Sequence, residues 1–286
     1  MSRDCVRVEG LTKRYGAVRA VDDLSFSVAD GEFVGFLGPN GAGKTTTIRM
    51  LCGLLRPTAG EIHVAGIDVR RDPVAVKRKI GILPEETETF DRLTGLELLV
   101  FSGRMQGLPT RQAETRAREL LELVGIEEQD QGRMVVDYSM GMRKKALLGA
   151  ALIHGPEVLF LDEPFNGVDV VSVQAIRSVL QELVHRGVTV FFSSHVMEVV
   201  ERLCTTIAII DQGKLKAAGR LAEVRNELGL APDASLEAIF LEAVGHTTRA
   251  VELSWLRDRS GSNESDSRPS SKPPPSPEAP DAPQPK

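Results

Sequence analysis

The eight residues Gly38-Pro39-Asn40-Gly41-Ala42-Gly43-Lys44-Thr45 decide the fold of this chain. They fit a phosphate-binding loop, in which a glycine and four further residues are followed by Gly-Lys-Thr. The apolar run 33–37 before the loop predicts a buried strand, and residues 45–51 after it predict the first turns of a helix. A strand, a glycine loop and a helix N-terminus together form an anion site.

The residue types within this stretch predict how phosphates are held. Gly38, Gly41 and Gly43 permit positive φ and close backbone approach, so that consecutive N–H groups can turn toward a phosphate. We expect the Lys44 ammonium to lie near β and γ phosphates. The hydroxyl of Thr45 is a ligand for Mg²⁺, and Thr46 can donate to an α-phosphate oxygen.

Composition excludes several classes of protein. The 286 residues suffice for one large or two small domains, and a net charge of −5 gives no basic excess that would indicate nucleic acid. We expect no signal peptide, and no apolar stretch approaches the roughly 18 residues of a membrane helix. Cys5, Cys52 and Cys204 fit no zinc spacing, so we expect buried, unreactive thiols in a reducing cytoplasm.

The pattern along the chain predicts an α/β fold. Residues 5–84 are expected to form strands around one helix, and residues 91–155 a helical segment. Strands return at 158–161, 188–192 and 207–210, with a helix near 171–186, which indicates a parallel sheet covered by helices. Residues 211–214 predict a hairpin turn, and residues 220–245 hold two short helices, the second at 236–244.

Two strand ends add candidate site residues. Asp162 and Glu163 follow the apolar run 158–161, where Asp162 can hold the Mg²⁺ shell through water and Glu163 can polarise a water in line with the γ-phosphate. His195 follows another buried strand, at the end where α/β sheets bind ligands, and can bond a γ-phosphate oxygen. Ser139 is a plausible N-cap, and together with Gly141 it predicts a second anion site at a helix start.

The order of these motifs resembles the nucleotide-binding subunit of an ABC transporter over about residues 5–245. The family signature Leu-Ser-Gly-Gly-Gln appears here as Tyr138-Ser139-Met140-Gly141-Met142, with the serine and the second glycine kept. This form, and the stretch 236–241, resemble the exporter branch that handles drugs, lipids, polysaccharides or ions.

The resemblance implies a P-loop NTPase core of ABC ATPase type, with an N-terminal antiparallel β subdomain and a helical insert. The expected ABC ATPase domain covers residues 1–245, with the insert at about 88–155 and a short C-terminal helical extension at about 220–245. Residues 257–286 contain eight of the sixteen prolines and are expected to form a disordered Pro/Ser-rich tail.

The resemblance also assigns roles. Glu163 and His195 would be catalytic, and Thr45 and Asp162 would hold Mg²⁺. Asp169 would lie in a loop facing a partner subunit. The residues implied to bind ATP are Tyr15, which would stack on adenine, Gly38, Pro39, Asn40, Gly41, Ala42, Gly43, Lys44, Thr45, Thr46 and Glu85. The residues implied to act on the partner chain's ATP are Ser139, Met140, Gly141 and Met142.

One of these positions departs from the family pattern. Glu85 stands where the family has glutamine, in a loop that touches Mg²⁺ and the membrane partner. We expect this change to alter coupling rather than to abolish ATP binding.

The implied function is ATP binding and hydrolysis that powers export through a separate membrane-spanning permease. Two chains would bind two ATP molecules head to tail, as a homodimer or as a heterodimer with another ATP-binding subunit, at the cytoplasmic side of the membrane and without nucleic acid. Two alternatives remain: a soluble ABC ATPase acting on ribosomes or DNA, and a regulatory relative that binds ATP without turnover. The cargo is not readable from these residues.

Overall fold

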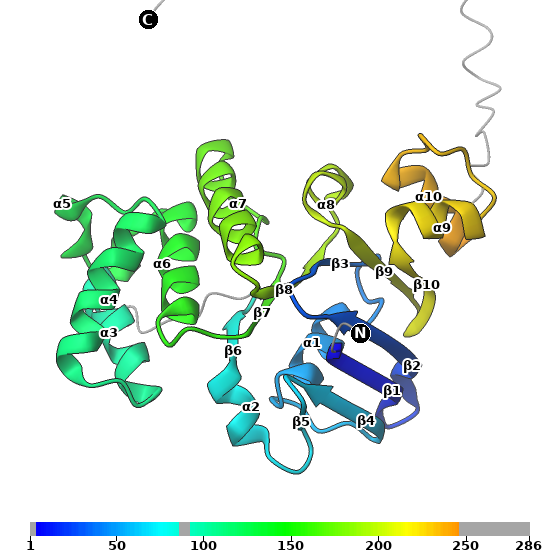
Figure 1. Ribbon diagram of the computed structural model, residues 1–286, viewed down its shortest axis with the longest axis horizontal. Coiled ribbons are helices and arrows are strands. Elements are labelled where there is room, and N and C mark those ends of the chain that lie inside the picture. The colour runs from blue at the N-terminus through cyan, green and yellow to red at the C-terminus, as the bar shows by residue number, and fades with distance from the viewer. Residues whose placement is uncertain (1–3, 86–91, 246–286) are drawn as a thin grey trace, which may run out of the picture. The chain divides into compact units, whose positions relative to one another are not determined.

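The computed structural model describes residues 4–85 and 92–245, and two β-sheets form its centre (Figure 1). The smaller sheet is antiparallel, with strand order β2-β1-β4-β5. Its strands are β1 (Asp4–Tyr15), β2 (Val18–Ala29), β4 (Ala59–Val64) and β5 (Ile67–Asp68). Within β1, buried Val6 and Val8 alternate with exposed Arg7 and Glu9, as expected for a sheet with one covered face.

The larger sheet is mostly parallel, with strand order β10-β9-β3-β8-β7-β6, and only its edge strand β10 runs antiparallel to its neighbour. Its strands are β3 (Phe33–Leu37), β6 (Ile80–Leu83), β7 (Val158–Asp162), β8 (Thr189–Ser194), β9 (Thr206–Asp211) and β10 (Lys214–Arg220). Every residue of β3, β7 and β8 is buried. Burial on both faces explains why these strands are continuous apolar runs rather than alternating ones.

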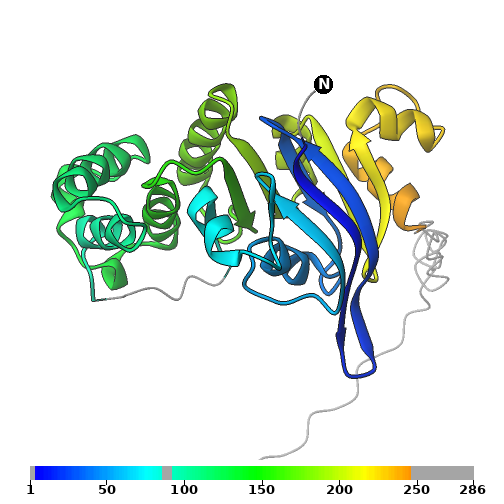
Figure 2. The ribbon, with the colours of Figure 1, turned by 60° about the horizontal axis from the view of Figure 1, so that its bottom comes forward.

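Successive residues of these strands enter two separate cores. Phe36, Phe160 and Phe191 pack with the antiparallel sheet and with helix α1 (Lys44–Leu51). Their neighbours Leu37, Leu161 and Phe192 pack on the other face, with helices α7 (Val170–His185) and α8 (Met197–Leu203). The larger sheet is therefore a central layer, and the views in Figures 1 and 2 show α1 and α7 on its opposite faces.

A helical segment connects β6 to β7, which are neighbours in the larger sheet. Its helices are α3 (Gly95–Met105), α4 (Thr110–Leu123), α5 (Glu128–Gln131), the 3₁₀ turn η1 (Val135–Asp137) and α6 (Met140–Leu152). Helices α3, α4 and α6 pack against one another (Figure 1). Thr94 begins α3 with a capping box, because its hydroxyl accepts from the Glu97 N–H while the Glu97 carboxylate accepts from the Thr94 N–H.

Most of the expected elements are present. The helix expected near 171–186 is α7, and the expected hairpin joins β9 to β10. The two C-terminal helices are α9 (Leu221–Glu227) and α10 (Leu236–Val244). The α/β fold with an N-terminal antiparallel sheet and a helical insert is thus confirmed, whereas the expected tail at 257–286 and the insert's start near 88 lie outside the described residues.

One expectation was wrong. Residues 5–84 hold a second helix, α2 (Pro73–Lys79), and not α1 alone. Asp72 caps it by accepting from the Ala75 N–H at 2.9 Å, and Pro73 occupies its first turn. A capping aspartate followed by proline is a helix-start signal that the sequence offered.

The cysteines are buried and free, as expected. Burial raises the pKa of the Cys5 thiol to about 11 and also raises the pKa of Cys52 and Cys204, so none of the three is a thiolate near neutral pH. Among the helices of the described ranges, none has the length and apolar character that crossing a bilayer would need.

Candidate active site

The loop between β3 and α1 turns sharply at two glycines. Gly41 has φ of 80° and Gly43 has φ of 106°, both in the left-handed region that L side chains rarely adopt. The Ala42 N–H donates to the Pro39 carbonyl at 3.1 Å, and Gly43 is the N-cap of α1. The expected strand, glycine loop and helix start therefore lie in sequence as predicted.

A hollow of about 340 Å³ lies over this loop. It is lined by Ala20, Pro39, Asn40, Gly41, Gly43, Lys44, Thr45, Thr46, Glu85 and Glu163. The hollow therefore brings together most of the predicted ATP-binding residues with the predicted catalytic carboxylate. Ala20, from strand β2, is a lining residue that sequence reasoning missed, because nothing in its local pattern distinguishes it.

Three predicted ATP-binding residues do not line this hollow. Gly38 lies against β9, because a Cβ there would collide with the carbonyl oxygen of Ile210, and Ala42 is 3% exposed. Tyr15 is 51% exposed at the end of β1, and the Lys13 ammonium lies 5.1 Å from its ring centroid. The stacking of Tyr15 on adenine stays a prediction.

Lys44 places a buried positive charge in the hollow. Its ammonium donates to the Gly38 carbonyl at 2.8 Å and lies 3.5 Å from a carboxylate oxygen of Glu163. The side chains of Lys44 and Glu163 are each 7% exposed. A lysine from the start of α1 and a glutamate from the end of β7 thus meet at one point, where charge is only weakly screened.

Ser193 of β8 links Asp162 to the backbone of Glu163 at the end of β7. The Ser193 hydroxyl donates to Asp162 Oδ1 at 2.6 Å and accepts from the Glu163 N–H at 2.9 Å. Ser193 is fully buried, so this link is shielded from water. Sequence reasoning missed Ser193, whose contacts with the Asp162 carboxylate and the Glu163 N–H follow from the pairing of Asp162 with Ser193 across the sheet.

Glu163 holds an unfavourable backbone conformation. Its φ is 48°, which for a residue with a side chain costs on the order of 1–3 kcal/mol. Its carbonyl accepts from the Lys144 ammonium at 2.8 Å, and the same ammonium donates to the Asn166 carbonyl at 2.9 Å. Lys144 lies on α6 and is 2% exposed; no local pattern marked it as part of the site.

His195 contacts Glu163 directly. Its Nδ1 lies 2.9 Å from Glu163 Oε2, and its side chain is half-exposed. The predicted catalytic histidine therefore lies beside the predicted catalytic carboxylate. Glu85, the predicted departure from the family pattern, also lines the hollow and is exposed.

The predicted signature residues lie at the start of α6, outside this hollow. Ser139 caps the helix by accepting from the Met142 N–H at 3.2 Å, which confirms the predicted N-cap. A Cβ on Gly141 would lie 2.7 Å from Asp169 Oδ2, so the signature approaches the loop that carries Asp169. Hydrogen bonds from Ser172 to its carboxylate lower the pKa of Asp169. The structure thus brings the signature to Asp169 and not to the hollow over Lys44.

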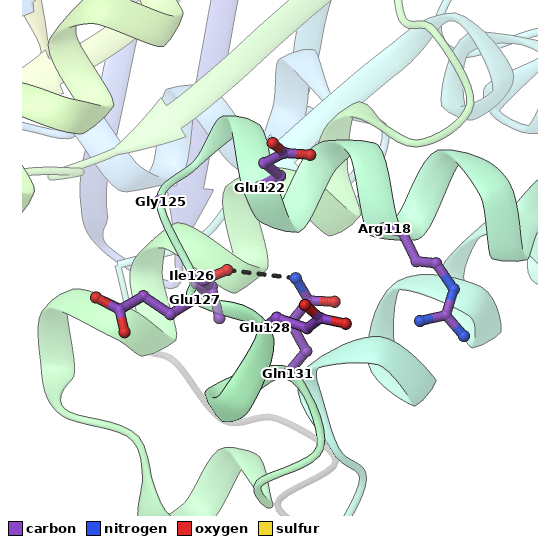
Figure 3. A pocket seen from close by; sticks show the side chains of 7 residues that line it. All are labelled: Arg118, Glu122, Gly125, Ile126, Glu127, Glu128 and Gln131. Atoms are coloured by element: carbon purple, nitrogen blue, oxygen red, sulfur yellow. Dashed lines mark hydrogen bonds between the residues drawn. The ribbon is translucent and has the colours of Figure 1, made fainter.

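A larger hollow of about 630 Å³ lies in the helical insert (Figure 3). Its lining residues are Arg118, Glu122, Gly125, Ile126, Glu127, Glu128 and Gln131. Figure 3 shows Gln131 pointing back to the Ile126 carbonyl, to which it donates at 3.4 Å. Three glutamates against one arginine disfavour a phosphate ligand, and none of the predicted site residues lies there.

A phosphate loop at one strand end, with two carboxylates and a histidine at neighbouring strand ends, defines a P-loop nucleoside triphosphatase. The model of the ABC transporter family matches residues 21–166, and the chain belongs to this family.

Relatives agree with this assignment. The chain is similar to the linearmycin resistance ATP-binding protein LnrL of Bacillus subtilis (strain 168), at 42% identity over 78% of this chain and 72% of LnrL. It is 39% identical to the daunorubicin/doxorubicin resistance ATP-binding protein DrrA of Streptomyces peucetius, over 78% of this chain and 68% of DrrA. A solved structure of the ATP-binding subunit of an ABC transporter superposes with a TM-score of 0.78 at 30% identity, covering 84% of this chain and 99% of that one.

The chain is therefore an ATP-binding and ATP-hydrolysing subunit of an ABC transporter. The relatives do not favour the alternatives of an ATPase acting on ribosomes or DNA and of a relative that binds ATP without turnover.

The glycine loop gives a first prediction. Gly43→Ala should lower the free energy of unfolding by about 2–4 kcal/mol, because a left-handed φ and a clash with the Ala20 carbonyl oxygen, 2.5 Å from the new Cβ, add together. Gly41→Ala is the matched control, since its φ is also positive but no atom lies within 4 Å of the new Cβ. We expect it to cost only about 1–2 kcal/mol. Urea unfolding without nucleotide measures both, and equal losses would contradict the assigned packing.

Proposed function

We propose that this chain powers export through a separate membrane-spanning permease, bound at the cytoplasmic face of the membrane. Two relatives carry the names of drug-resistance proteins, and removal of a drug from the cell is a direct route to resistance. The signature form at 138–142 supports the same branch. We further propose that the cargo belongs to the drug class.

The observation that carries the proposed chemistry is the meeting of Lys44 and Glu163 in one hollow, 3.5 Å apart. We assign Lys44 to the β and γ phosphates, where its charge offsets the charge that develops on the leaving group. We assign Glu163 to the attacking water, because its carboxylate is buried and held from several sides. His195 would orient that carboxylate through its 2.9 Å contact and reach toward the γ-phosphate.

The same hollow suits Mg²⁺. Thr45 lines it and offers a hydroxyl at the start of α1, whereas the buried carboxylate of Asp162, oriented by Ser193, is not part of the lining and would act through water. Within the described residues, no group of three or more His, Cys, Asp or Glu side chains can hold a metal, so phosphate and water oxygens would complete the shell. This is the usual arrangement for Mg²⁺, which keeps several waters and few protein ligands. When bound, the ion would neutralise charge on the β and γ phosphates.

The proposed site needs a second chain. Ser139 and Met140 are exposed and lie outside the hollow of their own chain, so a signature that binds ATP must act on the ATP of a partner. Val170 and Val171, next to Asp169, are 84% and 79% exposed. Exposed apolar side chains beside the signature indicate a surface that a partner chain would cover in the ATP-bound dimer. The partner is a second copy or another ATP-binding subunit.

We propose that the permease docks beside the loop that carries Glu85. A hollow of about 370 Å³ lies between β6 and α3, and Phe101 and Met105 from α3 line it. Met105 is 72% exposed. Since β6 ends two residues before Glu85, a permease segment seated here would sense the nucleotide through that loop.

The assignment of Glu163 gives a second prediction. Glu163→Gln should keep ATP binding and lower turnover by at least about 100-fold, because the amide cannot accept a proton from the attacking water. A stable ATP-bound dimer should then accumulate, measured by size-exclusion chromatography and phosphate release. Glu85→Gln is the control, since it lines the same hollow but should keep turnover. Hydrolysis at the parent rate in Glu163→Gln would refute its role.

The signature gives a third prediction. Ser139→Arg should block dimer closure, because a long cation replaces a small hydroxyl on the face that meets the partner. One chain should still bind ATP, measured by fluorescent nucleotide titration. Ser178→Arg on α7, also an exposed serine, controls for the added charge and should still dimerise. ATP-dependent dimerisation that survives Ser139→Arg would count against the signature assignment.

The docking site gives a fourth prediction. Tagged Glu163→Gln in ATP should co-purify a small polytopic membrane protein from solubilised membranes. Adding Met105→Glu should weaken this capture, because a charge would replace an exposed apolar side chain of the proposed docking hollow. Capture of ribosomes or DNA-bound proteins, or of no membrane protein, would refute the permease proposal.

A further inference from the structure

Lys144 is a buried charge that the proposed mechanism does not use. Its ammonium makes two bonds, to the carbonyls of Glu163 at 2.8 Å and Asn166 at 2.9 Å. The side chain is 2% exposed, and an apolar side chain of the same length would avoid the cost of burying a charge. The presence of a buried charge at this position therefore favours a role for Lys144 in the site.

The carboxylates of the site act on the charge of Lys144. Burial lowers the pKa of Lys144, and the carboxylates of Glu163, Glu85 and Asp162 act in the opposite direction. Three acidic side chains of the site thus stabilise the charged form of Lys144, which is not among the residues that line the hollow. The contacts place it behind Glu163.

The peptide of Glu163 depends on such support. Its φ of 48° is disfavoured for a glutamate, so the surrounding groups must hold it. Ser193 accepts from its N–H and Lys144 donates to its carbonyl, which fixes the peptide groups on both sides of the Glu163 Cα. The direction of the Glu163 side chain follows from this fixed peptide.

Lys144 also belongs to the signature helix. It lies on α6, five residues after the N-cap Ser139, and its second bond reaches the loop that leads to Asp169. Helix α6 therefore joins Ser139, which would meet the partner's ATP, to Glu163, which would act on the chain's own ATP.

We propose that Lys144 is a positioning residue that holds the Glu163 peptide and ties it to the signature helix. Engagement of Ser139 by the partner's ATP would then set the placement of Glu163 in the other composite site. This inference rests on the proposed function, because it requires Glu163 to orient the attacking water.

The first test is Lys144→Met in the full-length chain, which keeps the length of the side chain and removes the donor. We expect the KM for Mg–ATP and the Kd for ATP to stay within about twofold and kcat to fall by at least about tenfold. Lys145→Met is the matched control, because Lys145 is the next residue of α6 and donates to the exposed Gly125 carbonyl at 2.7 Å. It should keep the parent kcat.

Lys144→Gln covers the case in which the methionine variant does not fold. Its amide can serve one of the two carbonyls, so kcat should fall by at least about threefold with KM unchanged. Parent kcat in whichever variant is folded, judged by circular dichroism and thermal unfolding, would overturn the proposal.

A double-mutant cycle separates positioning from general damage. If Lys144 acts through Glu163, then Lys144→Met should slow single-turnover hydrolysis by less than about twofold in the Glu163→Gln background. An equal fall in both backgrounds would overturn the proposal. Normal turnover by Glu163→Gln alone would instead refute the proposed function, whereas slow Glu163→Gln with fast Lys144→Met would refute only the role of Lys144.

Discussion

The site depends on one constraint: three parallel strands must end at the same edge of the sheet. Leu37 of β3 pairs with Ser194 of β8, and Asp162 of β7 pairs with Ser193. The phosphate loop, Glu163 and His195 each follow directly from these strand ends. Because successive residues enter different cores, a slip of one residue would exchange Phe191 and Phe192 between the two faces. Apolar packing on both faces therefore fixes the register that brings Lys44 to Glu163.

Much of this arrangement could be predicted from the sequence because its signals are contiguous. The phosphate loop, the pair Asp162-Glu163 and His195 each follow a short apolar run, and parallel strands place such residues at one edge. Helix α7 was predicted nearly to its ends because its sixteen residues carry a long helical period. Burial of the three cysteines was predicted from their small number and from the absence of a zinc-binding spacing.

The remainder depends on contacts between residues far apart in the chain. Lys144 stands in the run Arg143-Lys144-Lys145, which is typical of a solvated helix face, and only the approach of α6 to the loop after β7 buries it. Ser193 looks like an ordinary strand end until its partner strand is known. Helix α2 is different: its seven residues bury only Val76, too short a period to recognise, and its local start signal, Asp72 followed by Pro73, was overlooked.

A residue that departs from the family signature packs against the loop after β7. Met140 stands in place of the first glycine, and its sulfur lies 3.0 Å from where a Cβ on Gly167 would be. Gly141 packs closely on Ser172, because a Cβ added to Gly141 would lie only 2.5 Å from the Ser172 hydroxyl oxygen. The start of α6 is therefore packed against the loop of its own chain, and a larger residue at either glycine would push the two apart. This contact keeps the signature away from the chain's own hollow. In the proposed dimer, each chain would therefore carry two half-sites, the hollow over Lys44 and the signature at the start of α6, which would move as one unit. In the proposed dimer, ATP would join two chains because neither can complete a site alone.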